Sequence, residues 1–426
     1  MGEYRIIGGN PIKGEMRIGG GKNAVLPILA ATVLNSGVSI LRNCPRIADT
    51  HTAVAILEAL GCRVVFDGNE ITADTSKINS TVVPEALVQK MRAAIIFMGS
   101  MLARFGAVRI NYPGGCALGA RPIDLHLKAL RQMGAVITEA HGFIDCKAEQ
   151  LRGTRIHLDF PSVGATENIM LAAALADGET IIENAAREPE IADLQSFLNG
   201  MGADVHGAGE GAIVVRGVKA LHDVAHTVMP DRIIAGTMLV AAAITKGEIV
   251  LDDVVPEHLT PITAKLAETG CTIRAYDRQI ALRAPAVIQP IDCLRTLPHP
   301  GFPTDMQAQM MAYLTRAQGA SVCVETIFES RNKHVAELKR MGADIILAPD
   351  GQTAVIKGAA RLHGTTVEAG DLRGGAALIL AGLAADGQTI VRQSEYVERG
   401  YEKIDQMLQA VGADVCFADS SATIAV

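Results

Sequence analysis

Six stretches of the chain are apolar on nearly every side over eight to twelve residues. They are residues 24–34, 93–103, 169–176, 233–244, 306–314 and 376–385. A helix that is apolar all round is buried, because it has no face to turn towards water. Stretches of this length are too short to span a bilayer. We therefore predict six short helices, each enclosed by the rest of its domain.

A short phrase with a central glycine follows each of these stretches. The six glycines, which are 73, 68, 68, 72 and 70 residues apart, are Gly61, Gly134, Gly202, Gly270, Gly342 and Gly412. An amphipathic helical pattern precedes the phrase, and β-branched residues follow it. We expect each glycine to end a helix in the left-handed conformation before a strand begins.

The repeating unit is thus a buried helix, a strand, an amphipathic helix and further strands. One such unit cannot enclose its own core, whereas three packed together can. The pattern predicts an α/β protein with two domains of three units each. The expected domains are residues 22–229 and residues 1–21 plus 230–426, because the strand-like N-terminus is compatible with completing the second domain.

Composition and net charge limit the classes of function that the chain can have. The chain has 426 residues, of which 49% are hydrophobic and 4% aromatic, and a net charge of −7. That charge argues against a general binder of nucleic acid or membrane surfaces. The eight cysteines form no CxxC pair and no zinc-like spacing, so we expect no metal, no disulfide framework and a cytoplasmic location.

The residues that open the buried helices carry the candidate chemistry. Equivalent positions in the six units are occupied by Lys22, Arg92, Ser162, Asp231, Asp305 and Asp371. Ser162, Asp231 and Thr304 are interpreted as N-caps. Lys22 and Arg92 oppose the helix dipole, which favours an anionic ligand held between them and the helix starts.

A Gly-rich loop at residues 111–126 holds Cys116 between small residues. An accessible thiol in such a loop is compatible with a reactive site for an anionic ligand. The alternative is a connecting loop in which Cys116 has only a packing role. Cys62 and Cys271 occupy positions where other units have Ala, and Cys323 and Cys416 fall in strand-like runs, so all four are expected to be packed. His299 and His334 remain open as site or surface residues.

Several motifs together resemble the UDP-N-acetylglucosamine 1-carboxyvinyltransferase family over essentially the whole chain. They are Gly21-Lys22-Asn23-Ala24, Pro113-Gly114-Gly115-Cys116, residues 119–126, 162–166, 184–190 and 302–307, Asp371-Leu372-Arg373 and Arg399-Gly400-Tyr401. The resemblance implies a two-domain inside-out α/β barrel (prism) of six βαβαββ-like repeats. It also implies transfer of the enolpyruvyl group of phosphoenolpyruvate to the 3-hydroxyl of UDP-N-acetylglucosamine.

The implied reaction is addition followed by elimination of phosphate, without metal or cofactor, at the first committed step of peptidoglycan synthesis. The catalytic residues implied by the resemblance are Cys116 (acid or covalent nucleophile), Asp305 (base), Lys22 and Arg399 (anion neutralisation), and Asp371 and Arg373 (support of the reacting centre). The substrate-binding residues that it implies are Lys22, Asn23, Arg92, Arg121, Pro122, Ile123, Asp124, Leu125, Ser162, Val163, Asp305 and Ile327.

Three alternatives remain. The sister reaction on shikimate 3-phosphate shares the implied fold and chemistry, although the Cys116 loop and the segment after Arg121 favour the sugar nucleotide. A catalytically silent binding protein is opposed by the joint presence of Lys22, Cys116, Asp305 and Arg399. A purely structural repeat array predicts no anion site. For the active enzyme, we expect the two domains to close on the charged substrates.

The resemblance also predicts that the epoxide phosphonate fosfomycin alkylates Cys116. Intact-mass measurement after incubation should show one adduct, and peptide mapping should place it on this thiol. Absence of the adduct, or its location on another cysteine, contradicts the prediction.

Overall fold

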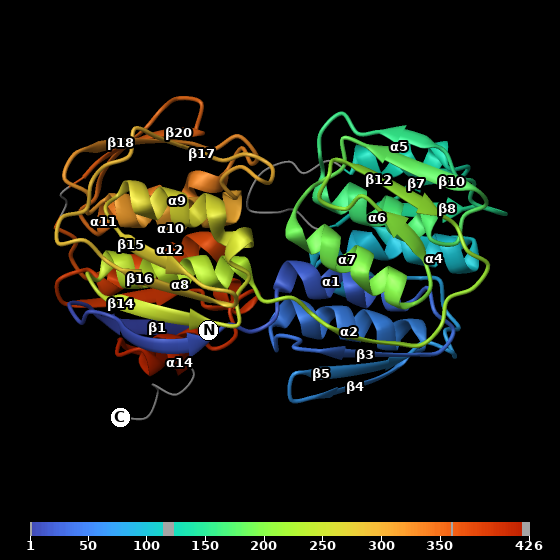
Figure 1. Cartoon of the computed structure of the whole chain (residues 1–426), viewed down its shortest axis with the longest axis horizontal. Helices are drawn as coiled ribbons and strands as arrows, with labels where there is room; N and C mark the ends of the chain where they lie inside the picture. Colours follow the sequence, from blue (N-terminus) through green and yellow to red (C-terminus); the bar gives the residue numbers. More distant parts are fainter. Residues whose placement is uncertain (1, 114–122, 359–360, 420–426) are drawn as a thin grey trace. The chain divides into compact units, whose positions relative to one another are not determined.

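The computed structural model describes residues 2–113, 123–358 and 361–419. Within these residues the chain forms two compact units (Figure 1). The first unit contains residues 20–113 and 123–229, and the second contains residues 2–19, 230–358 and 361–419. That each folds as an independent domain with the expected boundaries stays a prediction.

The first unit follows the predicted order of elements. Its elements are α1 (Lys22–Thr32), β3 (Val38–Arg42), α2 (Ala48–Leu60), β4 (Arg63–Asp67), β5 (Glu70–Asp74), α3 (Glu85–Val88), η1 (Arg92–Ile96), α4 (Phe97–Phe105), β6 (Ala107–Asn111), α5 (Asp124–Gln132), β7 (Val136–Ala140), β8 (Phe143–Lys147), β9 (Arg155–His157), α6 (Val163–Ala173), β10 (Glu179–Glu183), α7 (Pro189–Gly200), β11 (Asp204–His206), β12 (Ala212–Arg216) and β13 (Val224–Thr227).

The second unit repeats this order and includes the N-terminal strands. Its elements are β1 (Gly2–Ile7), β2 (Lys13–Arg17), α8 (Arg232–Ile244), β14 (Glu248–Asp252), η2 (Pro256–Leu259), α9 (Thr260–Glu268), β15 (Thr272–Ala275), β16 (Gln279–Arg283), β17 (Cys293–Arg295), η3 (Thr304–Met306), α10 (Gln307–Leu314), β18 (Ala320–Val324), η4 (Arg331–Lys333), α11 (His334–Arg340), β19 (Asp344–Leu347), β20 (Thr353–Lys357), β21 (Thr366–Glu368), α12 (Leu372–Leu383), β22 (Gln388–Arg392), α13 (Glu395–Glu398), α14 (Ile404–Ala410) and β23 (Asp414–Asp419).

Each unit, as far as it is described, has three sheets with a common strand pattern. In the first unit the orders are β13-β3-β5-β4, β6-β8-β7 and β11-β12-β10-β9. In the second they are β15-β16-β14-β2, β17-β18-β20-β19 and β21-β22-β1-β23. One edge pair of each four-stranded sheet is parallel and the other pairs are antiparallel.

Strands from distant parts of the sequence close these sheets. β13, which follows the third repeat, pairs in parallel with β3 of the first repeat. β2 pairs in parallel with β14, and β1 lies between β22 and β23. The N-terminal strands therefore belong to the sheets of the second unit, although the first unit follows them directly in the sequence.

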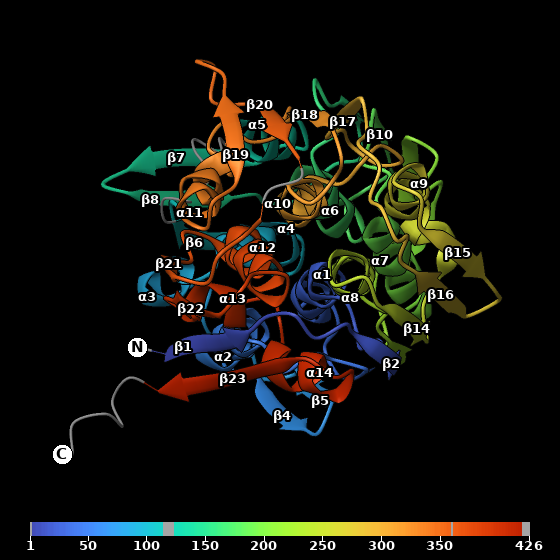
Figure 2. The same ribbon diagram turned by 90° about the vertical axis from the view of Figure 1, so that its left-hand side faces the viewer.

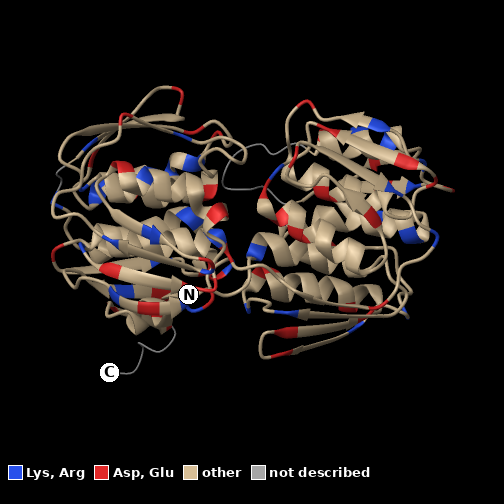
Figure 3. Cartoon of the chain, viewed as in Figure 1, with Lys and Arg blue, Asp and Glu red and all other residues tan. Residues whose placement is uncertain are grey.

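In each unit the sheets surround the apolar helices, as the inside-out arrangement predicts. In the second unit every residue of α8 is buried, and α8, α10 and α12 pack against one another. Figure 2 shows these three helices at the centre of their unit with its strands around them. In the first unit α1, α4 and α6 form the corresponding core. Lys, Arg, Asp and Glu appear on strands, loops, helix ends and the amphipathic helices (Figure 3). None of the described helices is long and apolar enough to cross a membrane.

The phrase glycines have the predicted backbone conformation. All six have positive φ, between 93° and 106°. This confirms that a residue without a Cβ ends each amphipathic helix. The expected burial of Cys62, Cys271 and Cys323 is also confirmed. The prediction for Cys416 is wrong, because it lies on the outward face of the edge strand β23, next to the buried Val415.

Gly412 offers a direct test of this backbone constraint. Its φ is +93°, and an added Cβ would meet nothing within 4 Å, so Gly412→Ala changes conformational preference without a collision. We expect the free energy of unfolding, measured by urea denaturation, to fall by about 1–2 kcal/mol. Gly19→Ala is the matched control, since Gly19 has an ordinary φ and equally open space. Equal effects of the two substitutions contradict the prediction.

Candidate active site

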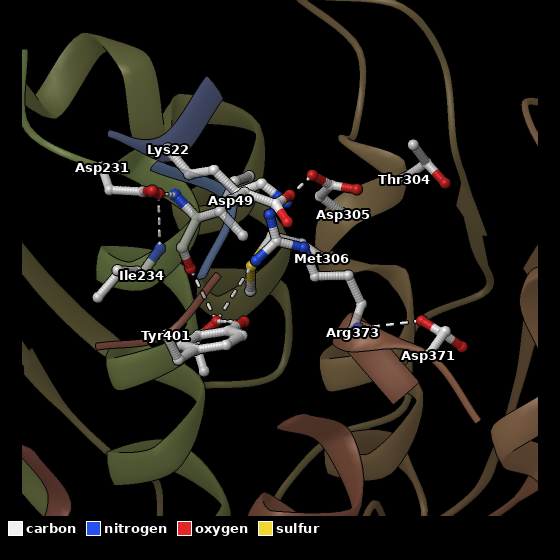
Figure 4. A network of polar contacts seen from close by, with 12 residues as sticks. Lys22, Asp49, Asp231, Ile234, Thr304, Asp305, Met306, Asp371, Arg373 and Tyr401 are labelled. Carbon is white, nitrogen blue, oxygen red and sulfur yellow. Dashed lines mark hydrogen bonds and ion pairs between the residues drawn. The ribbon is translucent and has the colours of Figure 1, made fainter. Parts of the chain in front are cut away.

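The second unit places a carboxylate between two buried guanidinium groups. Asp305 lies in η3, at the start of the buried helix α10. Its Oδ1 accepts a hydrogen bond of 2.6 Å from Nη2 of Arg331, and its Oδ2 accepts one of 2.9 Å from Nη2 of Arg373. The side chains of Arg331 and Arg373 are only 2% and 3% exposed, whereas that of Asp305 is 26% exposed. Figure 4 shows Arg373 and Asp305 directed towards each other. The carboxylate is therefore fixed from the interior and reachable from outside.

Asp371 lies at the start of the neighbouring buried helix. Its Oδ1 accepts hydrogen bonds from the backbone N–H groups of Arg373 and Gly374, at 3.0 and 3.1 Å, and so caps α12. The same oxygen is 3.8 Å from Nη1 of Arg331. The other oxygen, Oδ2, is buried and has no hydrogen-bond partner among the described residues. The oxygen that caps α12 is thus also the one that lies near Arg331, whereas Oδ2 is left unpaired among the described residues.

Arg373 holds its charge despite burial. Burial alone lowers the pKa of a guanidinium, but the nearby Asp305, and then Tyr401 and Asp231, raise the pKa of Arg373 above its ordinary value. Its guanidinium lies 5.5 Å from the centre of the Tyr401 ring. Within the described part of the chain, its Nε and Nη1 atoms have no hydrogen-bond partner. A buried cation with spare donors is suited to bind an oxyanion.

His334, which the sequence left open, is buried beside this cluster. It is 3% exposed, and its Nδ1 is 3.2 Å from the backbone carbonyl oxygen of Arg331. A carbonyl can only accept, so Nδ1 carries the proton. Burial lowers the pKa of His334 to about 4, opposed by the charge of Asp371 and assisted by that of Arg331. At neutral pH the imidazole is therefore uncharged.

Other expected residues of the second unit lie after a strand, at a helix end or at helix starts. Ile327 follows β18, and its N–H donates to Oε1 of Glu325 at 2.7 Å. Arg399 is half-buried at the end of α13. The N-cap interpretation of Thr304 is wrong, because its hydroxyl donates to Oε2 of Glu325 at 2.9 Å instead of accepting from the helix. Asp231 does cap its helix, accepting from Ile233 and Ile234.

In the first unit, Lys22 begins α1 and is paired with Asp49. The distance from Nζ to Oδ2 is 2.7 Å, and both side chains are largely buried, at 13% and 4% exposed. This corrects the view of Lys22 as an uncompensated cation, since Asp49 in the first turn of α2 offsets its conflict with the helix dipole. The position of Lys22 does not by itself require an anionic ligand.

The remaining expected binding residues also occupy helix starts. Arg92 begins η1, Asp124 begins α5, and Ser162 caps α6 by accepting from the N–H of Ala165 at 3.4 Å. Of the neighbouring residues, Asn23, Leu125 and Val163 are half-buried and Ile123 is buried. Cys116, Arg121 and Pro122 lie outside the described residues.

Sequence reasoning missed two members of these clusters, Arg331 and Asp49. Asp49 left a weak signal, an acidic residue in the first turn of an amphipathic helix. No sequence pattern marks Arg331 as the partner of Asp305, because the contact joins residues 26 positions apart on different elements.

Comparison with known proteins assigns the family. The sequence profile of EPSP synthase (3-phosphoshikimate 1-carboxyvinyltransferase) matches residues 6–408. A UDP-N-acetylglucosamine 1-carboxyvinyltransferase 2 from Caldanaerobacter subterraneus is 50% identical over 97% of this chain and 99% of its own length. One from Staphylococcus saprophyticus is 48% identical over 97% and 99%. The chain belongs to the EPSP synthase family, among its UDP-N-acetylglucosamine 1-carboxyvinyltransferase relatives.

Solved structures agree with this carboxyvinyltransferase assignment. The enolpyruvyl transferase NikO from Streptomyces tendae superposes with a TM-score of 0.88 at 25% identity, covering 98% of this chain and 99% of that one. An EPSP synthase from Acinetobacter baumannii gives a TM-score of 0.75 at 19% identity, over 98% and 100% of the two chains. The latter shows the shared fold of the carboxyvinyltransferases.

The depressed pKa of His334 predicts how stability depends on pH. Its folded pKa is about 4 and its ordinary value 6.5, so between these values only the unfolded state takes up the proton. The contribution of the neutral, buried His334 to the free energy of unfolding is complete above pH 6.5 and is lost as the pH falls towards 4. The difference in unfolding free energy between the parent and His334→Asn should shrink by roughly 1–3 kcal/mol over this range. Urea denaturation at several pH values measures it; a constant or growing difference contradicts the prediction.

Proposed function

We propose that this chain transfers the enolpyruvyl group of phosphoenolpyruvate to the 3-hydroxyl of UDP-N-acetylglucosamine and releases phosphate. The observation that carries the proposal is the near-50% identity to named UDP-N-acetylglucosamine 1-carboxyvinyltransferases over almost the whole of both chains. Because the product would enter peptidoglycan synthesis, we infer a cytoplasmic location as part of the same proposal. Addition followed by elimination needs an acid, a base and several fixed cations, and the chain offers candidates for each.

Asp305 is the proposed base. A carboxylate that accepts hydrogen bonds from Arg331 and Arg373 is held in its ionised form, which a base requires. The same contacts occupy its oxygens and reduce their basicity. An incoming phosphate or carboxylate attracts these guanidiniums and releases an oxygen for the sugar hydroxyl. Proton transfer requires the base to lie within hydrogen-bond distance of the hydroxyl. Binding of the anionic substrate would therefore activate Asp305 by freeing an oxygen to make that contact.

Other residues complete the proposed reaction. Arg373 offers unused N–H groups to the anion, and Asp371 fixes the start of α12 that carries it. Lys22, Arg121 and Arg399 neutralise the charges of phosphoenolpyruvate. Cys116 delivers a proton to the methylene carbon, for which a thiol with an ordinary pKa of about 8.5 remains protonated at neutral pH. Fosfomycin modification of Cys116 belongs to the same proposal.

The first unit supplies the proposed site for the sugar nucleotide. Asn23, Arg92, the segment from Arg121 to Leu125, Ser162 and Val163 are proposed to hold the UDP group. Several of these residues begin helices, whose free backbone N–H groups favour anions such as a diphosphate.

Phosphate release tests both the acceptor and the base. The parent protein should release phosphate from phosphoenolpyruvate with UDP-N-acetylglucosamine and not with shikimate 3-phosphate. Asp305→Asn should lower kcat by at least about 100-fold, because the amide cannot take the proton. The matched control is Asp253→Asn, a carboxylate of the same unit that also bonds arginines, Arg17 and Arg278, and that should retain kcat within about twofold.

Each outcome of this experiment has a separate meaning. Turnover with shikimate 3-phosphate alone overturns the proposed acceptor. Full activity of Asp305→Asn overturns the proposed base while leaving the acceptor intact. Circular dichroism of both variants checks that the fold persists, since Asp305→Asn also removes charge from between two buried guanidiniums.

A further inference from the structure

The amide of Asn168 is a junction between three helices of the first unit. Asn168 is fully buried in the middle of α6. Its Oδ1 accepts a hydrogen bond of 2.6 Å from the N–H of Gly99 in α4, and its Nδ2 donates one of 2.9 Å to the carbonyl of Ile95 in η1. Nδ2 also lies 2.8 Å from Nδ1 of His126 in α5. One side chain therefore bonds two other buried segments at once.

These contacts explain a break in the helix that carries Arg92. In an unbroken α-helix the carbonyl of Ile95 accepts from the N–H of Gly99, four residues later. The amide of Asn168 bonds both of these groups, at the point where η1 passes into α4. A polar group that inserts into the backbone ladder in this way bends a helix. A side chain at Gly99 would collide with Asn168, so the close approach of α4 and α6 requires glycine there.

The same amide fixes the tautomer of His126. Oδ1 of Asn168 accepts from the N–H of Gly99, which fixes the orientation of the amide. Its NH2 group therefore points at the carbonyl of Ile95 and at the imidazole of His126, so Nδ1 of His126 is the acceptor. The neutral ring then carries its proton on Nε2. An added Cβ at Gly164 would lie 3.1 Å from Cε1 of His126, so this ring packs beneath the first turn of α6. His126 is 6% exposed and follows directly after Asp124 and Leu125.

We propose that Asn168 is a positioning residue for the sugar-nucleotide site. It joins the segment that begins at Arg92, the helix that begins at Asp124 and the helix capped by Ser162, each of which carries proposed contacts to UDP-N-acetylglucosamine. Asn168 is buried more than one helical turn after the start of its own helix at Val163. It therefore acts on the ligand through the three helix starts and does not contact the ligand itself. The inference rests on the proposed function, because that function assigns the three starts to one ligand.

Substitution of Asn168 should separate the two substrates. Asn168→Ala removes all three contacts and should raise KM for UDP-N-acetylglucosamine about tenfold, with KM for phosphoenolpyruvate changed less than about twofold. Isothermal titration with UDP-N-acetylglucosamine measures the same loss without turnover. Asn168→Ser, which is uncharged and keeps a hydroxyl on the same side chain, is a milder second variant and should shift in the same direction.

Asn199 provides a matched control in the same unit. Its amide also bonds a main-chain N–H and a carbonyl, those of Val205, at 2.9 and 2.8 Å, although its side chain is exposed. It lies on α7 and touches none of the three helix starts through these bonds. Asn199→Ala should leave both KM values unchanged.

The contact with His126 provides a rescue test. His126→Leu removes the acceptor and should raise KM for UDP-N-acetylglucosamine, whereas His126→Asn retains an acceptor near the position of Nδ1 and should restore most of the affinity. The effects of Asn168→Ala and His126→Leu should be less than additive, since they break one shared contact.

The outcomes distinguish this inference from the proposed function. If the parent protein fails to turn over UDP-N-acetylglucosamine, the proposed function fails. If the parent is active but Asn168→Ala behaves as Asn199→Ala does, or raises both KM values equally, Asn168 has only a structural role and the inference is overturned.

Discussion

Burial of helices on every side is the constraint on which this structure depends. A helix such as α8 or α12, with sheets around it and no wet face, cannot carry charges along its flanks without a large desolvation penalty. In α8 and α12 the charged residues therefore lie at the helix starts, where unpaired N–H groups already need acceptors. Asp231 and Asp371 meet this need directly. The same confinement gathers charged residues such as Asp305 and Arg373 at the ends of a fold whose interior is almost wholly apolar.

The sequence predicted those features that arise from local patterns. Burial of the six helices follows from residues that are apolar all round, and the positive φ of Gly412 and its five counterparts follows from their place after an amphipathic helix. Features that depend on tertiary contacts were missed. Asp49 neutralises Lys22, and Arg331 reaches Asp305, only once separate elements have packed. Cys416 was misassigned because strand propensity does not say which face of an edge strand is covered.

The buried polar groups around Asn168 and those around Arg373 differ in how far their hydrogen-bonding capacity is used. Around Asn168 each amide group has a partner, so this network rigidifies the junction of three helices and holds it in one arrangement. Around Arg373 and Asp371, nitrogen and oxygen atoms remain without hydrogen-bond partners among the described residues. Leaving such groups unsatisfied costs about 1–3 kcal/mol each. In the cluster around Arg373, the unused N–H groups belong to a buried cation, which is the kind of donor that an oxyanion can satisfy.

This contrast separates positioning groups from binding groups within one architecture. A side chain whose hydrogen bonds are all satisfied by the protein, such as Asn168, can act on a ligand only through the elements that it holds. Arg373, by contrast, keeps unused N–H donors in a buried, charged environment. Binding of an oxyanion there yields a large gain in interaction energy, because a low dielectric strengthens each new contact. Under the proposed function, the penalty of the incomplete network is offset in the bound state, and anion binding and the release of Asp305 from its guanidinium partners are parts of one event.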